Sequence, residues 1–214
     1  RQVSNWRRFY AVINAASVFM EKAPRTVELD RSYSEQNLKY DIAQVRALRA
    51  FAYFYMVRIW GDVPLVTYSY DNGTFPSMPR TDAQTVLSYA KAELLTAIKD
   101  LPYQYGTQTN LYYGSYGAQW QGKLFNKLSA YSVLAHICAW QGNYAEAETY
   151  SAFIIDHASE INAKYTSIAD LTSETGLFYS NTSVKGSRIL GFNFAHNDNC
   201  LLYTSDAADE ARSV

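Results

Sequence analysis

The sequence lacks an excess of charge of either sign. Its 214 residues include 19 basic and 20 acidic side chains, which leaves a formal net charge of -1 at neutral pH. Lysine and arginine form no cluster, so the chain carries no field that would attract nucleic acid or anionic lipid. We therefore expect no nucleic-acid partner.

Long apolar runs are also missing. The best candidate for a membrane span is interrupted by Arg46, Arg49 and Arg58, and no run reaches the roughly 18 apolar residues that a span requires. The chain begins with Arg1 and shows no charged, apolar and small-residue signal sequence, so we expect any export signal to lie upstream.

Metal-binding and catalytic motifs are scarce. The two cysteines, Cys138 and Cys200, have no paired spacing, and the three histidines are far apart. We expect a buried thiol at Cys138, and neither a metal site nor a cofactor. Glycoside hydrolysis would need two carboxylates, for instance from among Asp62, Asp71 and Asp82, but any globular chain supplies such pairs, so we predict no enzyme.

Aromatic residues, in contrast, are abundant. The chain has 19 Tyr, 10 Phe and 4 Trp, which together make 15% of its residues. Tyrosine offers a flat apolar face and a polar edge, so an excess beyond the needs of a core hints at a binding surface.

The stretch from Ile42 to Leu65 organises the rest of the chain. Apolar residues cover almost the full circumference of a helix over 42–60, which predicts a central helix enclosed by neighbours. Gly61 can take the left-handed conformation that ends a helix and Pro64 cannot continue one, so we expect a hard stop there. For Arg46 and Arg49, a structural ion pair or a half-exposed stem is favoured over ligand contact.

Four further helices follow from periodicity and caps. The first has Asn5 as its N-cap and ends at Pro24; the central helix starts at Ser34 or Asp41, which the sequence leaves open. A third spans Thr81–Leu101 with Thr81 opening a capping box. A fourth starts at Gly122-Lys123 and runs through Cys138, and a fifth covers Tyr144–Ile154 after a tight turn at Gly142.

The last two helices resemble a tetratricopeptide unit. Superposing Gly61 on Gly142 aligns Ala50, Tyr53, Phe54 and Val57 with Tyr131, Leu134, Ala135 and Cys138. The central helix thus reads as the first helix of an earlier unit, with the loop 67–80 inserted before its second helix. The predicted fold class is all-α, with tetratricopeptide-like helix pairs, long aromatic loops and little strand.

A second long loop, from Tyr103 to Gln121, carries the candidate binding residues. It has tyrosines and a tryptophan among Gly, Gln, Asn, Ser and Thr, without apolar periodicity. Core packing and an exposed binding surface are both compatible with this pattern. A sugar-binding surface combines aromatic faces with amide groups, so the predicted glycan-binding residues are Asn110, Tyr112, Tyr113, Tyr116, Gln119 and Trp120.

The end of the chain is less regular. Residues 188–194 are predicted to form one short strand, and after Asn199 the composition changes abruptly. We expect an incomplete helical domain at 1–199, followed by a non-native or disordered tail at 200–214.

The run from Arg46 to Tyr55, followed by Gly61-Asp62-Val63-Pro64-Leu65, resembles the signature helix of the SusD/RagB family, glycan-binding lipoproteins of the Bacteroidetes outer membrane. Tyr10, Ile13 and Asn14 are similar to a helix that precedes it in the family, and the Arg80–Pro102 segment has the same opening and ending. Family members are longer, with a lipidated N-terminal cysteine and a loop-rich C-terminal half, so no family binding residue can be placed here by motif.

This resemblance implies a function. It implies capture of oligosaccharides at the outer leaflet of the outer membrane, facing the extracellular side, without cleavage. The implied partner is a TonB-dependent, SusC-like transporter, and membrane attachment is only through a lipid anchor upstream of this chain. The alternative is a tetratricopeptide scaffold that binds a peptide or protein in its concave groove.

Overall fold

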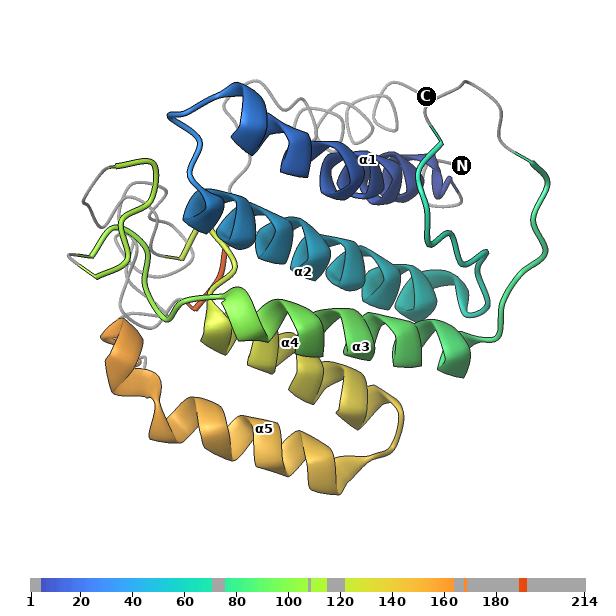
Figure 1. Ribbon diagram of the computed structural model, residues 1–214. Helices are drawn as coiled ribbons and strands as arrows, with labels where there is room; N and C mark the ends of the chain where they lie inside the picture. Colours follow the sequence, from blue (N-terminus) through green and yellow to red (C-terminus); the bar gives the residue numbers. More distant parts are fainter. Residues whose placement is uncertain are drawn as a thin grey trace, which may run out of the picture.

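The computed structural model describes residues 5–70, 76–107, 109–114, 122–163, 168 and 189–191. These residues form an all-α fold, as predicted, in which consecutive helices run antiparallel across the molecule (Figure 1). The helices are α1 (Arg7–Leu29), α2 (Glu35–Trp60), α3 (Ala83–Asp100), α4 (Lys127–Trp140), α5 (Tyr144–Asp156) and a short 3-10 helix, η2 (Ala158–Ile161).

Helix α2 occupies the centre of the described fold. It packs against α1 on one side and against α3 and α4 on the other. Twelve of its residues are buried, more than in any other helix, although α4, with seven of its fourteen, is as buried for its length. The predicted enclosure of this helix follows from its almost continuous apolar circumference.

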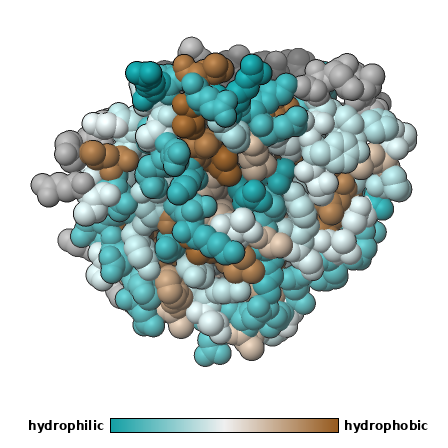
Figure 2. Space-filling view, in the orientation of Figure 1, coloured by the Kyte–Doolittle hydropathy of each residue, from teal (hydrophilic) through white to brown (hydrophobic). Residues whose placement is uncertain are grey.

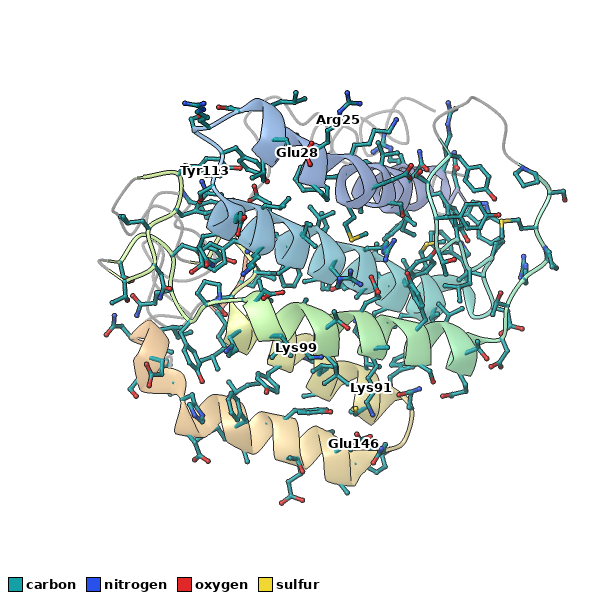
Figure 3. All side chains as sticks on the ribbon, in the orientation of Figure 1. Arg25, Glu28, Lys91, Lys99, Tyr113 and Glu146 are labelled. Carbon is teal, nitrogen blue, oxygen red and sulfur yellow. The ribbon has the colours of Figure 1, made fainter. Side chains whose placement is uncertain are left out.

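The two predicted helix pairs are present. Helix α3 packs mainly on α2 and α5 mainly on α4, so the chain repeats one antiparallel pair after the other. Lys91 of α3 and Glu146 of α5 point toward one another and join the two pairs with an ion pair (Figure 3). Cys138, at the position aligned with Val57, is a buried thiol as expected.

Caps explain where the helices begin, with some differences from prediction. The Ser34 side chain accepts a hydrogen bond from the Asn37 amide, which settles the start of α2. Helix α3 is capped by Asp82, one residue after the predicted Thr81. Helix α4 begins at Lys127 instead of Lys123, because Asn126 and Ser129 form a reciprocal capping box there.

The predicted end of the first helix at Pro24 is wrong. Helix α1 begins one residue after the predicted start, with the Asn5 side chain accepting from the Arg7 amide, and continues through Pro24 to Leu29. A proline removes one hydrogen bond and strains the preceding turn, a cost that packing can outweigh. Here Ala23, directly before the proline, is buried, whereas Arg25 and Thr26 after it are exposed, so the packing that favours the continued helix lies before Pro24.

The residues after α2 connect it to α3 through side chains and backbone. The Asp62 carboxylate accepts from the Ala83 amide at the start of α3, and Val63 forms an antiparallel bridge with Thr81. The loop between them is therefore closed at its base. Three helix side chains then hold the segment 64–70 that follows α2. The Tyr10 hydroxyl donates to the Pro64 carbonyl, and the Tyr53 hydroxyl bonds to the backbone amide and carbonyl of Val66. The Asn14 side chain bonds to the backbone amide and carbonyl of Tyr70.

Gly61 is predicted to be intolerant of side chains because of its backbone. It has φ 70° and ψ -120°, so the positive φ is confirmed, although ψ lies outside the left-handed helical region. No atom lies within 4 Å of an added Cβ, so strain and not crowding sets the cost. Gly61→Val should destabilise the fold by about 1 kcal/mol or more. Thermal melts test this, and an unchanged midpoint would refute it.

The predicted strand at 188–194 lies largely outside the described residues. Its three described members, 189–191, are in no strand, and the Gly191 amide donates to the Gly122 carbonyl. The tail at 200–214 lies entirely outside them, and the division at residue 199 stays a prediction.

Candidate functional site

The candidate site lies at the end of the molecule where the α1–α2 connection meets the loop between α3 and α4. A hollow of about 460 Å³ opens between the start of α2 and residues 109–114. Its lining is rich in hydroxyl and amide groups: Ser32, Ser34, Gln36, Asn37, Tyr40, Thr109, Asn110, Leu111 and Gly114. Tyr113 lies at the same end of the fold (Figure 3) but lines a second hollow of about 620 Å³, together with Tyr33 and residues of α1 that include Phe19 and Lys22.

A buried carboxylate anchors the loop to α2. Asp41 is 7% exposed and accepts hydrogen bonds from three phenols: Tyr33 at 2.8 Å, Tyr112 at 2.5 Å and Tyr113 at 2.5 Å. The rings of Tyr33 and Tyr113 stack with their centroids 6.2 Å apart. A carboxylate that is bonded in this way can be buried without being left unsatisfied.

Amide side chains complete the attachment. The Tyr40 hydroxyl donates to Asn110 Oδ1 at 2.9 Å, and the Tyr113 amide donates to Asn37 Oδ1 at 3.2 Å. Within the loop, the Gly106 amide donates to the Asn110 carbonyl at 2.8 Å. The loop is thus held at several points along its length by the first two turns of α2.

The two ends of the same loop, at Tyr105 and Phe125, are held one turn further along α2. Gln44 accepts from the Phe125 amide at 2.8 Å, and its amide group donates to the Phe125 carbonyl and to the Tyr105 hydroxyl. Tyr105 is buried and also donates to the Phe125 carbonyl. Helix α2 therefore positions both the middle and the end of the loop.

The backbone of the loop is strained at Tyr113. Tyr113 has φ 49°, an unusual value for a side chain of its size, and Gly114 follows with φ 67°. Such strain persists where the surroundings over-determine the conformation, and it often occurs at binding sites. Here the hydrogen bonds from Tyr113 to Asn37 and Asp41 fix the strained conformation.

The phenols of this cluster stay neutral over the physiological range. Burial raises the pKa of Tyr112 and Tyr33 well above the ordinary value, with Asp41 adding to the effect. Burial and the Asp41 carboxylate together raise the pKa of Tyr113 to about 12. In each case the ionised phenol loses solvation and faces a carboxylate, so the neutral form is favoured.

A pH dependence follows from these shifts. Unfolded tyrosines ionise near pH 10, whereas the folded cluster keeps its protons up to about pH 12 in the case of Tyr113. Between these values the unfolded state binds fewer protons, so stability should be full below pH 10 and fall as pH rises further. Alkaline titration of tyrosinate absorbance in folded and urea-unfolded protein checks this. Coincident titration curves would contradict it.

The structure places the predicted binding residues in different environments. Tyr113 is 52% exposed and Asn110 is half-buried, both beside the hollow. Tyr112 is only 7% exposed, because its hydroxyl reaches inward to Asp41, so of the two alternatives that the sequence left open this ring takes core packing. Tyr116, Gln119 and Trp120 lie outside the described residues. The glycan-binding role of this set stays a prediction.

Sequence reasoning missed Tyr33, Asn37 and Asp41, which build the other side of the site. One signal was available: Asn37 and Asp41 are four residues apart, so they share one face of a helix. Both are buried in the structure, and a pair of polar residues on a buried face requires partners.

The aspartates considered for hydrolysis have structural roles where the structure describes them. Asp62 and Asp82 both accept hydrogen bonds from backbone amides at the start of α3. Asp71 lies outside the described residues.

The described part of the chain also contains no group of three metal-ligating side chains. Among the same residues, no helix has the length and apolarity needed to cross a membrane.

Arg46 and Arg49 also prove structural. Both bond to Glu93 of α3, and Arg49 donates to Ser17 of α1 as well. This confirms the favoured interpretation of an ion pair.

On the face drawn in Figure 2, hydrophilic residues predominate and smaller hydrophobic patches lie among them.

Comparison with known proteins gives the family. No family model matches the sequence. A SusD-like protein from Formosa agariphila, P38, is 31% identical over 147 residues, which cover 67% of this chain and 24% of that protein. The crystal structure of a SusD superfamily protein from Bacteroides thetaiotaomicron is 96% identical with a TM-score of 0.85, and the match covers 92% of this chain and 43% of that one.

A more distant solved structure is similar over most of the described fold. A laminarin-binding SusD-like protein is 27% identical with a TM-score of 0.55, covering 68% of this chain and 28% of that protein. The chain thus spans less than half the length of each of these relatives. The signature residues after α2, the paired helices and these similarities lead to one conclusion: the chain belongs to the SusD/RagB family.

Proposed function

We propose that this chain contributes to a binding site for oligosaccharides in a protein that captures glycans without cleaving them. The observation that carries the proposal is the pair of adjacent hollows at the loop 109–114, which Asp41 holds: one is lined by hydroxyl and amide groups, and the other by the rings of Tyr33 and Tyr113. Sugar rings have C–H faces that pack on aromatic rings and hydroxyl edges that need donors and acceptors. The laminarin-binding relative supports a glycan as the ligand.

Tyr113 is the residue to test. Its ring is half exposed, whereas its backbone is fixed by Asn37 and its hydroxyl by Asp41, so it would present a preorganised face to a sugar. An open surface of this kind should bind weakly, with a dissociation constant near 1 mM, or about -4 kcal/mol. Removing one such ring should therefore weaken binding at least about tenfold.

The experiment is calorimetric titration of the full-length protein with bacterial, plant and host oligosaccharides, followed by the variant Tyr113→Ala. Tyr144→Ala is the matched control, because Tyr144 is 72% exposed on α5, far along the chain from the hollow. The control should bind like the parent. If Tyr113→Ala is folded and binds the preferred sugar as well as the control does, the surface that Tyr113 lines is not the glycan site.

We further propose that the captured sugar is delivered to a TonB-dependent, SusC-like transporter, with the protein attached to the outer leaflet by an upstream lipid anchor. Family membership supports this role. Cells that retain the transporter but lack the protein should take up the preferred oligosaccharide more slowly at low concentration. Equal uptake rates would count against delivery.

A further inference from the structure

The hydrogen-bond directions at the candidate site limit what it can bind. The tyrosine hydroxyls around it point their protons inward: Tyr33, Tyr112 and Tyr113 donate to Asp41, and Tyr40 donates to Asn110. A phenol that donates inward offers a ligand only its oxygen lone pairs. These oxygens can accept from sugar hydroxyls, but they cannot donate to a carboxylate or sulfate, whose oxygens only accept.

The charges around the hollow also disfavour a ligand that carries a carboxylate or sulfate group. None of the nine residues that line it is charged. The buried carboxylate of Asp41 follows the lining residue Tyr40 on α2 and accepts hydrogen bonds from three phenols, which do not neutralise its charge. Asp30, whose pKa is lowered by hydrogen bonds from Ser32, adds a second carboxylate beside the lining residue Ser32.

Cations do not line this hollow, and Lys22 of α1 lines the neighbouring hollow that Tyr33 and Tyr113 share. Arg31 and Lys39 belong to the same stretch of chain, but both are exposed and neither lines the hollow. The positive end of α2 lies here as well; its Asn37 amide is already bonded to Ser34, and Glu35 occupies its first turn.

The sequence of the loop agrees with this pattern. From Leu101 to Gly122 it contains no Asp, Glu, Lys, Arg or His, in a chain where 18% of residues are charged. A site for an acidic sugar would need arginine or lysine to pair with the anionic group.

We infer that this site selects uncharged oligosaccharides and discriminates against those that carry carboxylate or sulfate groups. The inference rests on the proposed function and specifies its ligand class. One unit-charge repulsion in a partly desolvated site should make an acidic oligosaccharide bind about tenfold more weakly than its neutral parent at low salt. Added salt screens the repulsion, so the difference should shrink as ionic strength rises.

The test compares matched ligands on the full-length protein. Neutral laminari-, xylogluco- and manno-oligosaccharides are titrated first, followed by the same oligosaccharides oxidised to carboxylates at their primary hydroxyls. Each pair is measured at low and at high ionic strength. The expected result is tighter binding of the neutral form and an acid penalty that decreases with salt.

Asp41→Asn, which removes the charge and keeps a side chain of the same shape, should reduce the acid penalty. Asp156→Asn, at an exposed position on α5, is the control and should leave the penalty unchanged. If the wild-type protein binds the oxidised form as tightly as the neutral one, or if salt weakens acid binding, the selectivity is overturned while glycan binding stands. Failure of every sugar to bind overturns the proposed function and this inference together.

Discussion

Glu93→Ala is expected to destabilise the fold by about 3–5 kcal/mol, the usual cost of removing one partner from a buried ion pair. Glu93 is 8% exposed and accepts from Arg46 at 2.7 Å and from Arg49 through both Nε and Nη2. Arg49 is 5% exposed and also bonds Ser17, so the carboxylate joins α1, α2 and α3. Without it, a guanidinium is left buried and uncompensated.

Urea unfolding at neutral pH measures this effect. Glu148→Ala is the control, since Glu148 lies on the exposed face of α5 and its loss should change stability by less than about 0.5 kcal/mol. Glu93→Gln should be intermediate, because the amide keeps an oxygen that can accept from Arg49. Equal stability of Glu93→Ala and the control would show that the network contributes nothing.

Asp41→Ala is expected to have the second largest effect, a loss of about 2–4 kcal/mol. Three phenols lose their hydrogen-bond acceptor. The Tyr112 side chain is buried, so water can hardly replace the acceptor of its hydroxyl. A hydrogen bond to a charged group contributes about 1.5–3 kcal/mol, and an unsatisfied buried donor costs a similar amount. The loop at 109–114 should also separate from α2, because two of its residues bond directly to this carboxylate.

Urea unfolding measures the stability, and limited proteolysis measures the release of the loop. Tyr113→Phe removes one of the three donors and should cost less than the loss of Asp41. Cleavage within 109–114 should be faster in Asp41→Ala than in Tyr113→Phe under conditions where both are folded. Identical cleavage rates would mean that Asp41 does not hold the loop.

The approximate position of each helix and its pairing followed from the sequence alone, whereas the end of α1 and the start of α4 were wrong and the start of α2 was left open. Signals for these features act over a few residues: the Ser34 side chain caps the amide three residues on, and Gly61 adopts a backbone that other residues avoid. The alignment of Gly61 with Gly142 predicted two antiparallel pairs, and the structure has them. The excess of tyrosine likewise pointed to the loop that faces the hollow.

The interior of the site depended on tertiary packing. Tyr112 and Tyr113 bond to Asp41 across 71 and 72 residues of chain, and no local pattern specifies such a pairing. The same packing buries Tyr112, for which the sequence left core packing and exposure equally open. Helix α1 also continues through Pro24, a residue that disfavours a helix interior by its own preference, with the buried Ala23 directly before it. Propensities and caps act between neighbours in sequence, whereas the fate of a polar side chain depends on which distant group reaches it.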